Sequence, residues 1–373
     1  MDAKELPARP SLEQYKKQAK DLVKSCKSGD PEAMRRAQPH GALRTLADAQ
    51  FIIAREHGFE SWPKFAKHIE ALARENSPVS KFESAADAIV TGDVATLESL
   101  LRENPELIRA RSTRKHHATL LHYVSANGVE DYRQRTPKNA VKIAEILLEA
   151  GAEVDAVADA YGKDTALGLV ATSVHPLRSG VQTELIELLL DHGANVDGVP
   201  GSGQPLTAAL ANGCPQAAEL LARHGARVDL VGAAGLGRLD LVKTLHAKAT
   251  QAQMESAFMW ACEYGRTAVI DFLLQCGVDV ATQDRNGQTG LHWAVIGGQL
   301  DTVKLLLKRK APLEAVNAYG GTALGQALWS SEHSDSGIDY APILKILIKA
   351  GAKLDPSLKE RVERVLGRRG PKS

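Results

Sequence analysis

Residues 288–316, QTGLHWAVIGGQLDTVKLLLKRKAPLEAV, decide the fold of this chain. A turn leads into one short helical pattern, and the apolar run VKLLL predicts a second helix over Leu300–Lys308. A unit of about thirty residues cannot bury its apolar face alone. Leu291, Ala294, Leu305 and Leu306 therefore require neighbouring units on both sides, so one unit predicts others.

The stretch resembles an ankyrin repeat. Its matches to the T-P-L-H-x-A signature are Thr289, Leu291, His292 and Ala294, with Gly290 in the proline position. The same pattern recurs from Phe82, and one residue that closes each second helix marks the register: Asn104, Gly151, Gly193, Gly225, Ala249, Gly277, Lys310 and Gly351. The resemblance implies an all-α ankyrin-repeat solenoid of about eight repeats over residues 82–356, with short β-turn fingers.

Residues 1–76 are predicted to form a small helical N-terminal domain. Helical spacing and capping residues indicate helices after Ser11, Thr45 and Ser61. This region is similar to an N-terminal region of bacterial ankyrin-repeat proteins, a similarity that implies no activity. We expect it to cap the first repeat, and we expect residues 357–373 to supply a C-terminal capping helix and tail.

The composition argues against several classes of partner. Forty-six basic and forty-five acidic residues create no global field for nucleic acid or a membrane surface. Four scattered cysteines lack metal-ligand spacing and indicate a reducing, cytoplasmic compartment. No apolar leader, membrane-length apolar run, GxGxxG motif or P-loop is present, so we expect a cytoplasmic protein without a cofactor.

The repeat spacing is irregular. Intervals between the register marks run from 24 to 47 residues, against a typical period of about 33. Fingers are predicted to be missing near residues 229 and 252, and three repeats gain long loops at residues 129–140, 174–183 and 330–340. Insertions inside repeats usually lie on one face, often the binding face.

In this family the inner helices and fingers form a concave binding face. Positions expected on that face are Asp87, Val90, Thr91, Tyr123, Ala126, Asn127, Leu169, Thr172, Ser173, Ala208, Ala211, Asn212, Gly232, Gly235, Leu236, Trp260, Glu263, Tyr264, Trp293, Ile296, Gly297, Gln326, Trp329 and Ser330. The small residues in the middle predict a hollow walled by Trp260, Trp293 and Trp329. The alternative is that the first two indoles complete the core under weak fingers.

The leading hypothesis is a module that binds a protein or peptide partner. Its predicted contacts are Tyr123, Trp260, Glu263, Tyr264, Arg285, Asn286, Gln288, Trp293, Gln326 and Trp329. The alternative is an enzyme or small-molecule receptor, such as a sugar-acting hydrolase. Glu263, with its pKa raised by desolvation, would then be the acid or base, and the candidate partners are Glu332, His333 and Asp335. A third hypothesis is a structural spacer with no groove preference.

Clustered histidines raise the question of a metal. His116, His117 and His122 lie close in sequence, but His122 and His292 match the structural histidine of the repeat signature, so we expect no metal site. His175 and Arg178 in a long loop could bind an anion, and a solvated loop is the simpler interpretation.

Overall fold

A computed structural model describes residues 3–7, 9–41, 43–74, 76–201, 204–333 and 337–367. The regular secondary structure of these residues is helical apart from one short hairpin, in which β1 (Val157–Ala158) pairs antiparallel with β2 (Asp164–Thr165), and an isolated bridge between Gln283 and Thr289. The predicted all-α class is confirmed. The chain forms two compact units, residues 1–226 and 227–373, and each is described by itself. No helix among the described residues combines the length and apolar character needed to cross a membrane.

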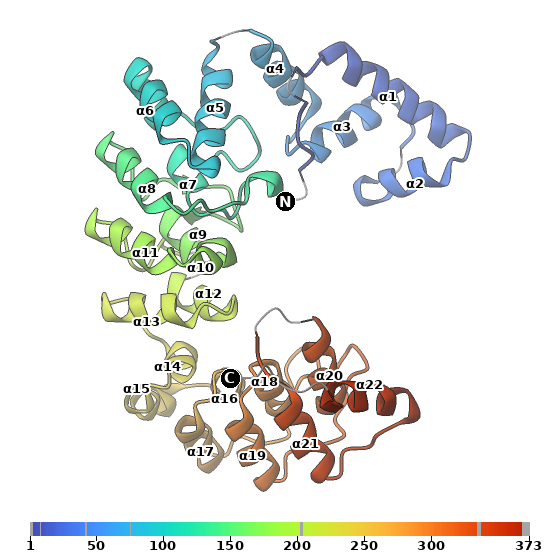
Figure 1. Cartoon of the computed structure of the whole chain (residues 1–373), viewed down its shortest axis with the longest axis vertical. Helices are drawn as coiled ribbons and strands as arrows, with labels where there is room; N and C mark the ends of the chain where they lie inside the picture. The colour runs from blue at the N-terminus through green and yellow to red at the C-terminus, as the bar shows by residue number, and fades with distance from the viewer. Residues whose placement is uncertain are drawn as a thin grey trace. The chain divides into compact units, whose positions relative to one another are not determined.

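Unit 1 begins with a group of short helices (Figure 1). Their bounds are α1 Leu12–Lys27, α2 Pro31–Ala37, η1 Gln38–His40, α3 Leu46–Glu56 and α4 Trp62–Leu72. Ser11 and Thr45 cap α1 and α3 as predicted, whereas the Ser61 side chain makes no capping hydrogen bond and α2 was not expected. Tyr15, Phe59 and Phe65 form the centre of a separate small core.

Helix pairs follow in unit 1, with the first and second helices of the pairs forming two columns (Figure 1). The elements are α5 Pro78–Thr91, α6 Val94–Glu103 and η2 Pro105–Arg109; α7 Leu120–Tyr123, η3 Asp131–Arg133 and α8 Ala140–Glu149; α9 Ala166–Thr172, α10 Val174–Ser179 and α11 Gln182–Asp191; and α12 Pro205–Ala211 with α13 Pro215–Arg223. Two of the long loops predicted from the sequence contain η3 and α10, so both carry helical turns.

Unit 2 continues the pattern and ends on one further helix. Its elements are α14 Leu230–Leu236, α15 Leu239–Leu245 and η4 His246–Lys248; α16 Gln251–Glu263 with α17 Thr267–Gln275; α18 Gly290–Ile296 with α19 Leu300–Lys308; α20 Ala323–His333 with α21 Ala341–Lys349; and α22 Pro356–Gly367. We number the helix pairs in chain order, so that α18/α19 is the seventh pair and α20/α21 the eighth.

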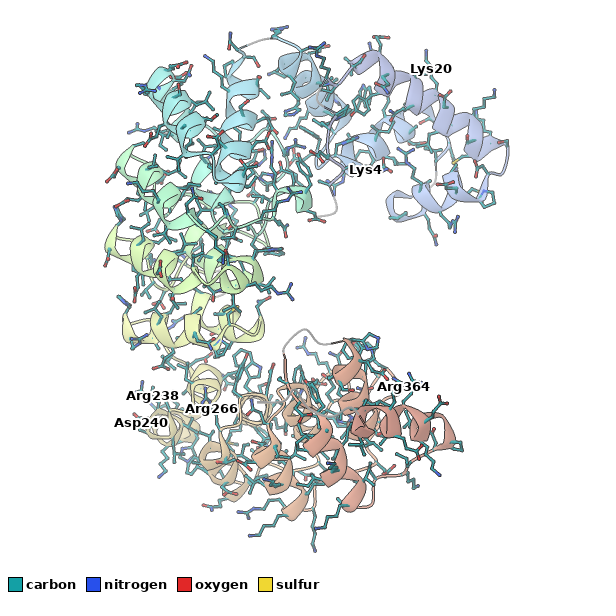
Figure 2. The ribbon with its side chains drawn as sticks, viewed as in Figure 1. Lys4, Lys20, Arg238, Asp240, Arg266 and Arg364 are labelled. Carbon is teal, nitrogen blue, oxygen red and sulfur yellow. The ribbon has the colours of Figure 1, made fainter. Side chains whose placement is uncertain are left out.

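The missing finger near residue 252 has a local cause. Thr250 caps α16, which runs for 13 residues, so the chain enters the helix where a finger would otherwise turn. Arg266 from the start of α17 lies across Gly237 and donates from Nε to the Gly235 carbonyl at 2.8 Å, beside the Arg238–Asp240 ion pair (Figure 2). This hydrogen bond from the Arg266 side chain to a backbone carbonyl connects the fifth and sixth pairs without a finger.

Neighbouring pairs bury each other's apolar residues, as the repeat pattern predicts. Leu291, Ala294 and Leu306 are fully buried in one continuous core of unit 2, and Leu305 is partly buried against it. The signature histidine also has the structural role that the sequence predicts. His292 Nδ1 lies 2.9 Å from Thr289 Oγ1, and its Nε2 donates to the Gly321 carbonyl of the next finger at 3.1 Å. The corresponding Thr119–His122 contact is 2.8 Å in unit 1.

A buried ion network, not predicted from the sequence, joins the first helices of unit 1 to its helix pairs. Arg114, with only 1% of its side chain exposed, pairs with Glu130 and, at 3.0 Å, with Glu83 of α5. It also donates to the His57 carbonyl at the end of α3 at 3.0 Å. Arg133 completes the network by binding Glu83 at 2.7 Å. Burial raises the pKa of Glu83, but Arg114 and Arg133 outweigh it and hold that pKa below its usual range.

Replacing Arg114 with alanine should strongly destabilise unit 1. Glu83 and Glu130 would remain buried without a full set of partners, and breaking a buried pair costs about 3–5 kcal/mol. Chemical denaturation followed by circular dichroism measures the change. The matched control is Lys142→Ala, which removes an exposed pair with Glu145 and should leave the stability nearly unchanged. Equal effects of the two substitutions would show that the network contributes little stability.

Candidate functional site

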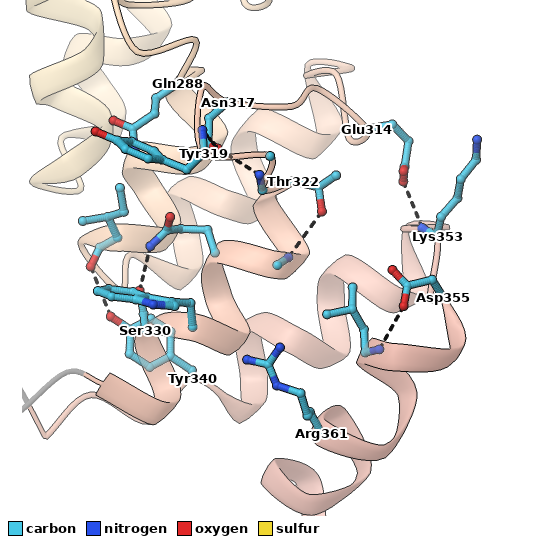
Figure 3. Close-up of a pocket in the computed structure, with 17 residues that line it drawn as sticks. Gln288, Glu314, Asn317, Tyr319, Thr322, Ser330, Tyr340, Lys353, Asp355 and Arg361 are labelled. Carbon is cyan, nitrogen blue, oxygen red and sulfur yellow. Dashed lines mark hydrogen bonds between the residues drawn. The ribbon is translucent and has the colours of Figure 1, made fainter. Parts of the chain in front are cut away.

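A pocket of about 1060 Å³ opens on the eighth helix pair of unit 2 (Figure 3). Its walls are α20, the finger that precedes α20, and α22, with Gln288 and Ile296 of the seventh pair at one edge. The volume suits several side chains of a bound segment better than a single water or ion.

Helix α20 supplies the floor of the pocket. Gly325, Gln326 and Trp329 lie on one face of this helix because their spacing follows its period. Trp329 is 55% exposed and stacks on His333 with ring centroids 4.9 Å apart. Gln326 donates to Ser330 Oγ at 3.1 Å. Full burial of a large apolar side chain contributes roughly 1.5–3 kcal/mol of favourable free energy. The exposed indole of Trp329 gains only part of this, and a partner that covers it would supply the rest.

The finger of the eighth pair, residues 316–322, forms the second wall. Asn317 Oδ1 accepts the backbone N–H groups of Tyr319 at 3.0 Å and Gly321 at 2.9 Å, which fixes the turn. Tyr319 is 78% exposed. The large apolar side chains that are exposed in the described part of unit 2 all lie in the eighth pair and its finger: Val316, Tyr319, Trp329 and Ile338.

Charges around the pocket are balanced. Glu314 accepts the backbone N–H of Lys353 at 2.9 Å, and Arg361 of α22 binds Glu332 at 2.5 Å. The hydrogen bond from Arg361 is the main reason that the pKa of Glu332 lies below its usual value. Two acidic residues, Glu314 and Asp355, and two basic residues, Lys353 and Arg361, line the pocket. These charges cancel, so they favour neither an acidic nor a basic occupant.

Comparison with known proteins agrees with the repeat geometry. A family profile described as ankyrin repeats in three copies matches residues 230–317 and 258–357. The human Notch-regulated ankyrin repeat-containing protein is 37% identical over 87 residues, which are 22% of this chain and 75% of the human protein. The chain belongs to the ankyrin-repeat family.

Two further relatives share shorter parts of their length with this ankyrin-repeat chain. The Caenorhabditis elegans ankyrin repeat and KH domain-containing protein mask-1 is 29% identical over 230 residues, 58% of this chain but 8% of the worm protein. A putative ankyrin repeat protein of Rickettsia bellii is 31% identical over 108 residues, 26% of this chain and 56% of its own. This chain therefore spans less than two thirds of the length of either relative.

The ankyrin repeats of unit 2 hold the predicted binding residues in different environments. Gln288, Gln326 and Trp329 line the pocket, although Gln288 itself is 7% exposed. Arg285 and Asn286 are exposed on the seventh finger. The remaining four, which are half-buried, are Trp260, Glu263, Tyr264 and Trp293.

Two of the tryptophans take part in the core rather than in the pocket. Trp260 and Trp293 pack against the core of unit 2, and Trp293 Nε1 donates to Asp284 Oδ2 at 3.1 Å. The interpretation in which these indoles complete the core is therefore supported by their contacts. Only Trp329 remains largely exposed.

Several residues predicted on the exposed face are instead buried, and those predictions were wrong. Tyr123 is fully buried because the long loop after α7 folds over it; its hydroxyl reaches Glu130 at 3.4 Å and Arg133 lies over its ring. Ala126 and Leu169 are also fully buried. In unit 2, Gly232, Gly235 and Leu236 are buried where α14 packs on α16, so they form no open floor of a hollow.

The proposed catalytic residues do not gather in the pocket. Burial raises the pKa of Glu263 to about 7, as the sequence predicted, yet Glu263 is not among the residues that line the pocket. Glu332 is held by Arg361, and His333 Nδ1 bonds the Trp329 carbonyl at 2.9 Å. Asp335 lies outside the described residues.

Unit 1 carries a smaller polar pocket of about 440 Å³. Its lining includes Asn127, Thr172 and His175, with the exposed Tyr161 at the edge. The clustered histidines have structural contacts: His117 Nδ1 lies 2.8 Å from Asp159, and His116 Nδ1 accepts the Ala118 N–H at 3.1 Å.

Four residues that line the pocket of the eighth pair were not predicted from the sequence: Tyr319, Gly325, Lys353 and Arg361. One signal was available. The eighth repeat reads TALG at residues 322–325, so Gly325 occupies the position of the signature histidine. A Cβ at Gly325 would meet only Thr322 Oγ1, at 3.8 Å. The missing imidazole leaves open space that the sequence pattern alone could have located.

Glu263→Gln should stabilise the protein at high pH. The folded chain holds the Glu263 proton up to about pH 7, whereas an unfolded glutamate releases it near 4.5. The unfolded state therefore binds fewer protons between these values, and wild-type stability falls as pH rises through this window. Glutamine removes that penalty, so the variant should gain on the order of 1–3 kcal/mol at pH 8 and nothing at pH 4. Denaturation at both pH values tests this, with the exposed Glu363→Gln as control; a constant difference would contradict it.

Proposed function

We propose that the chain binds a protein or peptide partner through the groove face of its ankyrin repeats, with the pocket of the eighth pair as the main contact. Ankyrin repeats generally mediate protein binding. The observation that carries the assignment to this pocket is that Tyr319 and Trp329, which are 78% and 55% exposed, both line it. Aromatic anchors beside a pocket are typical of interface hot spots.

The predicted contact residues have different roles in this proposal. Trp329 and Tyr319 are the apolar anchors, and Gln288 and Gln326 are polar contacts at the edge. Arg285 and Asn286 extend the surface along the seventh finger. Trp260, Tyr264 and Trp293 support it from the core side. A cytoplasmic location, and the division into residues 1–76, 82–356 and 357–373, are part of the same proposal.

Catalysis is the second candidate because Glu263 has the raised pKa of a general acid. Glycoside hydrolysis requires two carboxyl groups around one bound sugar. The pocket is lined by neither Glu263 nor Glu332. Partner binding therefore accounts for more of the observed geometry.

Linear peptides selected from a phage-displayed random library against the full chain test the proposal. Trp329→Ala should weaken binding of the selected peptide by about 30-fold or more, the effect of losing an aromatic hot spot worth roughly 2 kcal/mol. Tyr319→Ala should weaken it too. Fluorescence polarisation measures the affinities.

The matched control is Tyr161→Ala, which removes a finger tyrosine of similar exposure, 71% against 78%, from unit 1. This change should leave the affinity unaltered. Peptides that bind the Trp329→Ala variant as well as wild type, or no selected peptide at all, would reject the pocket as the contact surface.

A further inference from the structure

The seventh and eighth fingers share one backbone design. In the seventh, Asp284 Oδ1 accepts the N–H groups of Asn286 and Gln288 at 2.8 and 2.9 Å. In the eighth, Asn317 Oδ1 accepts the N–H groups of Tyr319 and Gly321, which are likewise two and four residues further along the chain. Tyr319 therefore corresponds to Asn286, and Gly320 to Gly287, which has a similar positive φ of 69° against 78°.

The outer side of the seventh finger is covered by the eighth. The Asn286 carbonyl accepts the Ala318 N–H at 2.7 Å. A Cβ at Gly287 would lie 3.3 Å from the Asn317 Cα, so the next backbone passes directly over this glycine. The same bond recurs in unit 1, where the His116 carbonyl accepts the Asp159 N–H at 2.7 Å. In both places a finger offers one carbonyl to the finger that follows.

The corresponding groups of the eighth finger are open. Among the described residues, no N–H donates to the Tyr319 carbonyl. No atom lies within 4 Å of a Cβ built on Gly320. Gly325 replaces the histidine that, in the seventh pair, reaches the next finger. In the described residues that follow Gly351, the chain turns into α22 without forming a further finger.

Helix α22 limits what can occupy this place. It packs against α20 and α21, and Leu358 and Arg361 form a wall of the pocket. A further helix pair, including one from a second copy of this chain, would need the surface that α22 covers. An extended segment needs only the finger edge and the pocket.

We propose that the eighth finger receives an extended, uncharged segment of the partner protein in the position of a ninth finger. A backbone N–H of that segment bonds the Tyr319 carbonyl, its chain crosses Gly320, and an apolar side chain enters the pocket between Gly325 and Trp329. This mode is backbone addition to an open edge. It rests on the proposed function and specifies how the partner is held.

N-methylation of the bound peptide tests the backbone bond. The library-selected peptide is synthesised with an N-methyl group at each position in turn, and each analogue is titrated against the full chain. One N–H should be essential, so that its methylation lowers affinity at least about fivefold, in line with the loss of one hydrogen bond. Methylation at the flanking positions should have smaller effects.

A filled pocket provides the second measurement. Gly325→Leu adds a side chain where the structure has space, in a helix that favours leucine over glycine, so thermal stability should be maintained. It should lower peptide affinity at least about tenfold by occupying the pocket. The matched control, Lys345→Leu on α21, places the same side chain on the exposed surface outside the pocket and should not change the affinity.

The outcomes separate the two proposals. If Trp329→Ala abolishes binding but every N-methyl analogue and Gly325→Leu bind normally, edge addition is wrong and the groove assignment stands. If Trp329→Ala binds normally, the groove assignment itself fails. If sedimentation of the full chain alone shows a dimer that Gly325→Leu dissociates, the occupant is a second copy, and the proposed partner segment is overturned.

Discussion

Each helix pair of this protein has a core that only its neighbours can complete. Leu291, Ala294 and Leu306 are fully buried because residues of the flanking pairs cover them. Stability in such a stack is approximately a sum over neighbouring interfaces, so the ends need covers of their own.

The two ends are covered by different physical means. The early helices of unit 1 are held to the first pairs through Arg114, which joins the His57 carbonyl to Glu83 and Glu130. A buried ionic network tolerates little rearrangement, because any carboxylate left unpaired carries a large desolvation cost. In unit 2, α22 covers α20 and α21 with Leu358, Val362 and neighbouring apolar residues. Helix α22 leaves the backbone edge of the last finger open.

Particular residues show how far the sequence could predict the site. Gln326 and Trp329 were predicted to share an exposed face of their helix because they are three residues apart, and both line the pocket. Tyr123 had an equivalent position in its repeat, yet the path of residues 129–140 buries it. Sequence spacing gives the direction of a side chain on its own helix, but not whether a distant loop covers it. The positions of Tyr319 and Arg361 at the pocket depend on how the eighth finger and α22 pack beside α20, which the repeat spacing does not specify.

The sequence by itself determined the repeat, the caps of α1 and α3, the structural role of the signature histidine, the lost finger before α16 and the raised pKa of Glu263. These depend on local hydrogen bonds, on helical period or on burial that the repeat imposes. Only the tertiary structure decided which tryptophans are exposed, that Arg114 lies in a buried ion network, and that Tyr319 and Gly320 face open space. Those features depend on contacts between residues far apart in the chain, and repeat periodicity does not specify such contacts.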